Sequence, residues 1–141
     1  MSVKYAAFGT LLKRGNGQEP EEFVTIGGIS NISGPGMTVD TLDATAHDSP
    51  GGFEEVIASF IRTSEVTLEV RFDPSDTEHQ GLLDDLKSRV KRNFQVVFPD
   101  ADETTWTFSA FVTAYELTAP HDGLLGLNVT LKPTGPIEVE A

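Results

Sequence analysis

The chain has 141 residues, of which 38% are hydrophobic and 9% aromatic, a composition typical of a globular domain and unlike that of a disordered chain. It carries 22 acidic and 10 basic residues, and the resulting formal net charge of −12 argues against sequence-specific binding of DNA or RNA. With no cysteine the sequence excludes disulfides and thiolate chemistry, and no apolar run approaches the roughly 20 residues of a membrane span.

The first forty residues predict short strands joined by glycine-rich turns. Residues 23–26 and 29–32 are apolar segments on either side of Gly27-Gly28, a pattern that predicts a tight hairpin. Gly34-Pro35-Gly36 predicts a turn, after which a strand is expected from Met37 or Thr38 to Asp43.

The most informative segment is Asp43–Glu65, which is expected to be a long loop between two strands. Compact domains usually join strands by a handful of residues, and longer connections are generally functional or disordered. This one is too apolar for a solvated linker, so it predicts a surface that another copy or a partner covers. Its large apolar side chains are Phe53, Val56, Ile57, Phe60 and Ile61.

A regular strand and then a helix follow this segment. Residues 65–72 alternate between polar and apolar side chains, which predicts a strand with one buried face. A helix is expected over about residues 75–91, because Ser75 and Glu78 match a capping box and acidic residues precede basic ones as the helix dipole prefers. The basic residues at its end are interpreted as helix-end charge, with a phosphate-binding patch as the less favoured alternative.

Three more strands are expected, over residues 92–98, 104–118 and 125–131. Apolar side chains of the longest one fall on both faces, which predicts either a β-bulge or cover on both sides. Together the elements predict a mainly β fold, a sandwich or barrel of about seven to eight strands with one flanking α-helix. No repeat or linker divides the sequence, so a single domain over residues 1–141 is expected.

No catalytic, cofactor-binding or metal-binding residues are predicted. His47, His79 and His121 lie far apart, and no two of them have the spacing of paired metal ligands. His47, Asp48 and Ser49 are adjacent, but a catalytic triad is assembled from separate elements around an oxyanion hole. The sequence therefore predicts no enzyme.

Four features in this order resemble the major tail tube proteins of long-tailed, siphovirus-type bacteriophages. They are the segment Gly27–Gly36 (GGISNISGPG) leading into a strand, the segment Thr45–Gly52 (TAHDSPGG), the alternating strand with its helix, and the pair Thr105–Phe108 (TWTF) and Gly135–Ile137 (GPI). The resemblance extends over nearly the whole chain.

The resemblance implies hexameric rings whose inner sheets join into a barrel and which stack into a tube through which DNA passes without specific binding. Loop 43–65 would then pack on neighbouring subunits or on the next ring. Implied partners are further copies of the chain and the tape measure, tail tip and tail terminator proteins, with no cofactor and no membrane. The implied location is the virion tail, assembled in the host cytoplasm.

A lumen lined by carboxylates would repel DNA phosphates. Asp40, Glu65 and Glu69 are the candidate lumen acids, since they lie on the polar faces of two predicted strands. The alternative is that these carboxylates face the solvent outside a tube.

Two other functions stay open at this stage. One is a tube subunit of a contractile tail or of a secretion or injection device, which neighbouring genes would distinguish. The other is a monomeric ligand- or sugar-binding β-sandwich, whose pocket would use exposed aromatic residues such as Tyr5 or Tyr115.

Overall fold

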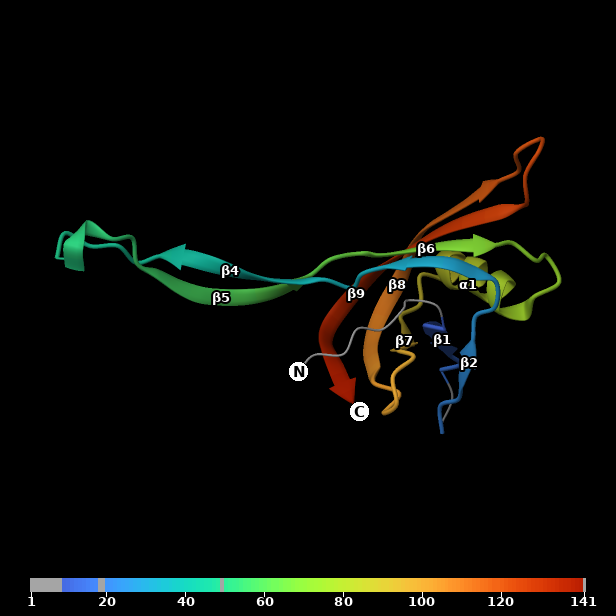
Figure 1. Cartoon of the computed structure of the whole chain (residues 1–141), viewed down its shortest axis with the longest axis horizontal. Helices are drawn as coiled ribbons and strands as arrows, with labels where there is room; N and C mark the ends of the chain where they lie inside the picture. The colour runs from blue at the N-terminus through green and yellow to red at the C-terminus, as the bar shows by residue number, and fades with distance from the viewer. Residues whose placement is uncertain (1–8, 18–19, 49, 141) are drawn as a thin grey trace.

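The computed structural model describes residues 9–17, 20–48 and 50–140. They form a curved seven-stranded sheet, a helix packed on it, and a two-stranded arm that extends away from it (Figure 1). The order in the large sheet is β2-β1-β7-β8-β9-β6-β3, with every neighbouring pair antiparallel. The elements are β1 (Leu11–Gly15), β2 (Phe23–Thr25), β3 (Ile29–Ser33), β4 (Met37–Asp43), η1 (Pro50–Gly52), β5 (Val56–Thr63), β6 (Val66–Arg71), α1 (Thr77–Ser88), β7 (Arg92–Val97), β8 (Thr105–Thr118) and β9 (Gly126–Glu140).

The core lies on the concave side of the large sheet. In β6 the predicted alternation is confirmed, because Val66, Leu68 and Val70 are buried while the residues between them are exposed. Burying each of these side chains is worth about 1.5–3 kcal/mol. A slip of one residue would turn this face outward, so the burial also fixes the register of β6 against β9.

Of the two alternatives predicted for strand 104–118, a bulge or cover on both faces, the bulge is present in β8. The register against β9 shifts between Val112 and Ala114, so Val112 is buried whereas Ala114 is exposed. Beyond the bulge Tyr115 turns toward α1, and its hydroxyl donates a hydrogen bond to the carbonyl oxygen of His79 at 3.2 Å.

Helix α1 begins later and ends earlier than predicted, and its cap is not the predicted one. The carboxylate of Asp76 accepts hydrogen bonds from the first free backbone amides of the helix. Ser75 cannot serve as the cap because its hydroxyl donates to Asp73. Arg89 adopts a left-handed conformation and ends the helix. In the described part of the chain no helix is long and apolar enough to cross a membrane.

A buried ion cluster holds α1 against the sheet. Asp85, only 2% exposed, accepts hydrogen bonds from Nε and Nη2 of Arg14 at 2.7 and 2.9 Å. Arg92 Nε donates to the same carboxylate at 2.9 Å, so one helical residue connects β1 and β7. Burial alone would lower the pKa of Arg14, but Asp85 and Glu78 outweigh it and the pKa is raised. Arg92 therefore helps to hold α1 against the sheet.

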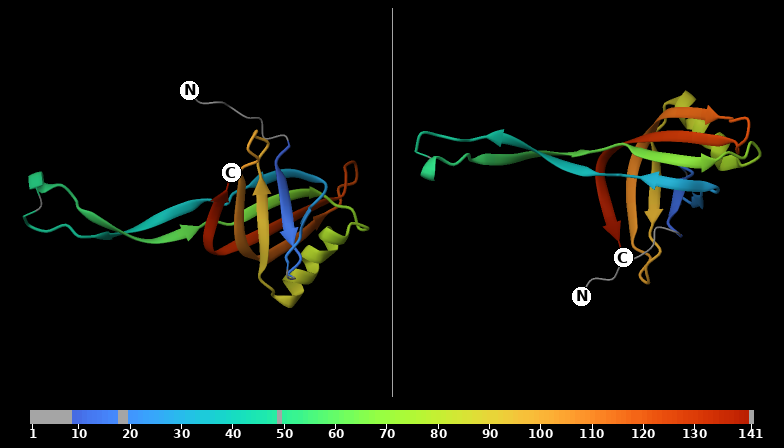
Figure 2. Two further views of the ribbon diagram at one scale, coloured as in Figure 1. Left: turned by 90° about the horizontal axis from the view of Figure 1, so that it is seen from below. Right: turned by 45° about the horizontal axis from the view of Figure 1, so that its top comes forward.

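The prediction of a hairpin around Gly27-Gly28 is wrong. β2 pairs with β1 and β3 pairs with β6, so these two strands form opposite edges of the sheet. The reason is that the amide of Ile26 donates to Leu12, which commits this side of the turn to β1. The short connection brings the two edges together and curls the sheet into an open barrel (Figure 2).

Gly28 is expected to be essential for this connection. Its φ is +77°, and a Cβ there would lie 2.8 Å from the carbonyl oxygen of Arg71, whose amide donates to Gly28. We expect Gly28→Ala to lower the free energy of unfolding by roughly 1–3 kcal/mol. Gly27→Ala is the matched control, because its Cβ would meet only Asp76 Oδ2 at 3.5 Å. Equal stability of the two variants in urea unfolding would contradict this account.

Candidate assembly interface

The segment predicted as a loop is largely a β-hairpin arm. β5 pairs antiparallel with β4 along almost its full length, and only the tip between the two strands lacks regular pairing. The arm leaves the large sheet and extends far beyond it (Figure 1). The prediction of a loop was wrong because both faces of β5 carry apolar residues, which hides the alternation by which an ordinary half-buried strand is recognised.

Local hydrogen bonds explain why the chain turns at the tip. Thr45 and Glu55 bond to each other through the Thr45 hydroxyl, and Ala44 donates its amide to Glu55. The Thr45 amide also donates to Asp43 Oδ1 at 2.9 Å. Hydrogen bonds from Thr45 lower the pKa of the Asp43 carboxyl, and the side chain of Thr45 contributes more to this shift than its backbone does. These contacts close the hairpin where β4 ends.

The root of the arm is fixed to the large sheet. Ser64 donates its amide to the carbonyl of Gly36, and Gly36 donates back to the Ser64 hydroxyl at 2.7 Å. Lys132 of β9 donates to the carbonyl of Thr63 at 2.8 Å, and the Thr63 hydroxyl donates to Pro133. The arm therefore has a defined direction relative to the sheet.

Both faces of the arm are apolar and exposed. Strand pairing places Ile57 beside Leu42 on one face and Ile61 beside Val39 on the other. The five apolar residues predicted from the sequence are all exposed, with Phe60 at 75% and Phe53 at 76%. Sequence reasoning missed three more on β4, because that strand looked like an ordinary sheet strand: they are Met37, Val39 and Leu42. No described element of the chain covers them, so the arm is an unpartnered apolar surface.

The candidate lumen acids do not form one surface within a single subunit. Asp40 lies on the arm and pairs with Arg62. Glu69 lies on the exposed face of β6, opposite Asn128 of β9 and Asn31 of β3. Glu65 is also exposed, just before β6 begins. Only Glu65 and Glu69 belong to the same region of the molecule.

The histidines are separated in the structure as they are in the sequence. His79 is buried, its Nδ1 accepts from the Asp73 amide at 3.1 Å, and its Nε2 lies 2.6 Å from the Gly27 carbonyl. Nε2 therefore carries the proton, and the ring links α1 to the β2–β3 connection. His47 and His121 are exposed, while Ser49 lies outside the described residues. Within the described ranges no three potential ligands cluster to hold a metal.

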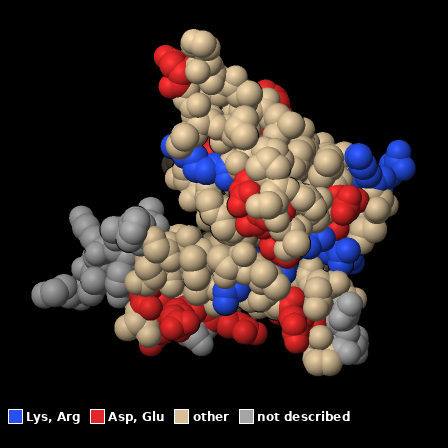
Figure 3. All heavy atoms as spheres, turned by 90° about the vertical axis from the view of Figure 1, so that its right-hand side faces the viewer, with Lys and Arg blue, Asp and Glu red and all other residues tan. Residues whose placement is uncertain are grey.

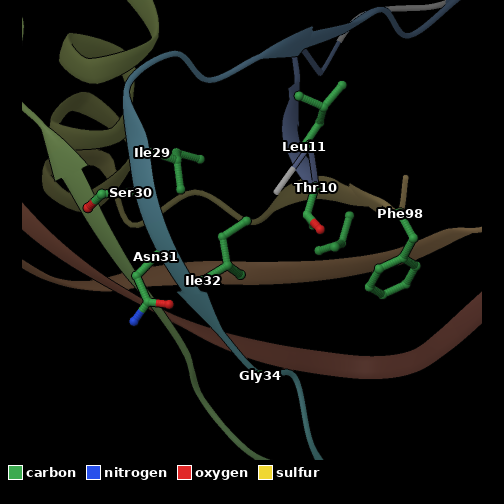
Figure 4. A pocket seen from close by; sticks show the side chains of 10 residues that line it. Thr10, Leu11, Ile29, Ser30, Asn31, Ile32, Gly34 and Phe98 are labelled. Atoms are coloured by element: carbon green, nitrogen blue, oxygen red, sulfur yellow. The ribbon is translucent and has the colours of Figure 1, made fainter. Parts of the chain in front are cut away.

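A groove of about 670 Å³ opens between β1 and β3 of the curled sheet (Figure 4). Apolar side chains and backbone dominate its lining, and Figure 4 shows Ile29 and Ile32 of β3 across from Leu11 of β1. The sequence could not predict this groove, since its walls come from distant strands. Of the aromatic residues predicted for a binding pocket, Tyr115 is half-buried against α1 and Tyr5 lies outside the described residues.

Comparison with known proteins identifies the family. A family model described as lambda phage tail tube protein matches residues 7–139, nearly the whole chain. The chain belongs to the lambda phage tail tube protein family. The resemblance inferred from the sequence is thus confirmed, and the mainly β fold with a flanking helix is that of tail tube proteins. No curated protein sequence matches the chain.

Solved structures of tail-like particles share the fold of this tail tube protein. The tail of an empty gene transfer agent particle, with C6 symmetry, matches with a TM-score of 0.79 at 19% identity, covering 98% of this chain and 100% of the other. The sheath–tube complex of an extracellular contractile injection system gives 0.70 at 16% identity, with coverages of 99% and 93%. The SPP1 tail tube gives 0.69 at 9% identity, with coverages of 92% and 75%.

Proposed function

We propose that the chain forms hexameric rings that stack into a tail tube, and that the negatively charged channel lets DNA pass during ejection. The observation that carries this proposal is the arm, a long hairpin with two exposed apolar faces and no partner in its own chain. The sixfold symmetry of the gene transfer agent tail supports the number of subunits in a ring.

The arm is suited to assembly for a physical reason. Its apolar faces project from one side of the subunit, so they meet a different surface on the next copy. Such a heterologous contact repeats, and it generates a closed ring or an open filament according to the rotation between copies. Ring closure would also cover the exposed sheet edges that otherwise favour aggregation. The residues assigned to this contact are Phe53, Val56, Ile57, Phe60 and Ile61.

Negative-stain electron microscopy of the purified protein over a concentration series tests the proposal. Rings or hollow tubes are expected above a critical concentration. A monodisperse monomer at every concentration, also after addition of preformed tail tips, would contradict it.

The partners and location follow from the same proposal. The tube would contact tape measure, tail tip and tail terminator proteins, assemble in the host cytoplasm and remain in the virion tail as a structural protein without enzymatic activity. Related tube folds occur in structures described as the cap and the baseplate of an anti-feeding prophage.

A tube subunit of a contractile tail or injection device is the second candidate. The observation that favours it is the shared fold with the contractile injection system tube. A sheath gene beside this gene would support this candidate, whereas a tape measure gene without a sheath would support a flexible, non-contractile tail. The groove between β1 and β3 is the one feature that fits a monomeric ligand-binding module, which would stay monomeric at all concentrations.

The candidate lumen acids give a further prediction. If Glu65 and Glu69, the two candidates that share a region, line the channel, Glu65→Lys combined with Glu69→Lys should assemble but slow or trap the DNA, because lysine attracts phosphates that carboxylates repel. DNA release from reconstituted tails measures this effect. Asp84→Lys with Asp122→Lys makes the same change in net charge at two exposed residues, one on α1 and one on the β8–β9 turn, and should release DNA normally. Normal release of DNA by both double variants would mean that Glu65 and Glu69 do not line the channel.

A further inference from the structure

The large sheet carries opposite charges at its two ends. Lys87, Arg89 and Lys91 surround the turn between α1 and β7, and all three are exposed. We call this turn the basic pole. Arg14 and Arg92 lie near it but are neutralised by Asp85 and Glu78, and within the described residues no ion pair involves the three pole residues. The three side chains of the basic pole therefore present exposed positive charge. The acids near them are Asp84 on the same helix and, on the adjoining β1–β2 connection, Glu22 and Glu21, whose carboxylate accepts a hydrogen bond from Asn93.

The other end of β7 is acidic. The β7–β8 turn exposes Asp102 and Glu103. Strand register brings the end of β9 to the same place, because Glu138 lies opposite Thr107 and Glu140 opposite Thr105 at the start of β8. We call these four exposed carboxylates the acidic pole. Figure 3 shows Asp and Glu side chains gathered along the lower left of the molecule and Lys and Arg side chains at its right-hand edge.

The two poles face in opposite directions. β7 runs from one pole to the other, and its six residues span about 20 Å at the usual rise of a strand. That separation exceeds the Debye length of about 8 Å at physiological salt, so the poles of one subunit do not neutralise each other. The arm extends across the direction of β7 (Figure 2), so the poles and the arm serve different contacts.

We propose that the basic pole of one copy docks on the acidic pole of the next, as the head-to-tail contact between stacked copies of this chain. The inference rests on the proposed function and names the residues of one of its contacts. A surface that is complementary to another surface of the same molecule makes a heterologous contact, which propagates along one axis. Complementary rim charges also set the register and exclude the reversed orientation, because like poles repel.

Charge reversal tests this contact. Lys87→Glu with Lys91→Glu reverses the basic pole, and Asp102→Lys with Glu140→Lys reverses the acidic pole. We expect each double variant to raise the critical concentration for tube formation by roughly tenfold or more, since several ion pairs become repulsive. The quadruple variant restores opposite signs and should assemble within roughly threefold of the wild type, as pairing would be re-formed with the signs exchanged. Sedimentation measures the critical concentration, and electron microscopy identifies the tubes.

Controls separate the poles from net charge and from folding. Glu116→Lys with Asp122→Lys changes the net charge as the acidic-pole variant does, at the end of β8 and on the projecting turn that follows it, and should assemble like the wild type (Figure 1). Lys87→Gln with Lys91→Gln removes charge without reversing it and should give an intermediate shift, and thermal unfolding checks that every variant is folded. Raising sodium chloride to 1 M shortens the Debye length to about 3 Å and should also raise the critical concentration of the wild type.

The outcomes are distinguishable. If the wild type forms tubes and the charge-reversed variants assemble equally well, this inference is overturned and the proposed function stays intact. The same holds if the quadruple variant is folded but fails to assemble. A control variant as impaired as the acidic-pole variant would also overturn it, because net charge alone would then explain the effect. A wild-type protein that never assembles would overturn both.

Discussion

Phe60→Asp is expected to leave a folded monomer that forms no tubes. The Phe60 side chain is 75% exposed in the isolated subunit, so its replacement should change the free energy of unfolding by less than about 0.5 kcal/mol. In an assembled interface the same position would lose about 1.5–3 kcal/mol of apolar burial. It would also bury an unpaired carboxylate, whose desolvation costs several kcal/mol more. Assembly should fail while the fold persists.

Two variants make this experiment specific for the arm. Phe60→Leu keeps an apolar side chain and should assemble with a modest loss, because much of the buried area remains. Leu124→Asp places the same charge at another exposed apolar residue, 66% exposed on the β8–β9 turn, and should assemble normally. Light scattering and electron microscopy report assembly, and circular dichroism reports the fold. Intact tubes from Phe60→Asp would refute the role of the arm.

Asp85→Ala is expected to have the largest effect on stability of the variants considered. It removes the carboxylate that accepts three hydrogen bonds from Arg14 and Arg92, and it leaves two guanidinium groups without their main partner. Breaking a buried ion pair by removing one partner typically costs about 3–5 kcal/mol. We expect about 3 kcal/mol in urea unfolding, since the two arginine side chains keep some contact with water.

Asp84→Ala is the matched control for this experiment. Asp84 is exposed and adjacent in sequence, so its loss should change stability by less than about 0.5 kcal/mol. Asp85→Asn keeps the shape and one acceptor oxygen, and its stability should lie between those of the wild type and Asp85→Ala. If Asp85→Ala and Asp84→Ala are equally stable, the ion cluster does not hold α1 on the sheet.

Sequence patterns predicted the strands of the second half of the chain that bury one face, but not β1, which buries Leu12. β6, β7 and the first part of β9 alternate clearly because their polar residues face out and their apolar residues face the core. β9 continues to Glu140, well beyond the predicted end at residue 131. The sequence predicts either a bulge in β8 or cover on both of its faces, because Phe111 and Tyr115 lie on the face opposite the other apolar residues of a regular strand. The structure has the bulge. The tail tube resemblance added the order of the elements, which no single periodicity supplies.

The remaining features depend on contacts between distant residues. The sequence predicts a loop for the arm because β5 has no buried face that would produce a regular alternation of polar and apolar residues. Arg14 and Asp85 are 71 positions apart, so no local pattern indicates that they meet. The two glycines of the β2–β3 connection predict a hairpin, and only the pairing of β2 with β1 and of β3 with β6 excludes it. The acidic pole likewise arises from register, which joins a turn to the end of β9.

The exposed arm has a consequence for colloidal stability before any tube exists. The arm of a free subunit exposes two apolar faces, and such a surface favours non-specific aggregation as readily as ordered tube assembly. The net charge of −12 opposes random encounters, because every subunit repels every other at long range. As the pH falls and the carboxylates are protonated, that repulsion weakens while the apolar faces stay unchanged. Precipitation in mild acid is therefore expected to compete with ordered polymerisation, and its onset should shift to lower pH in Phe60→Asp.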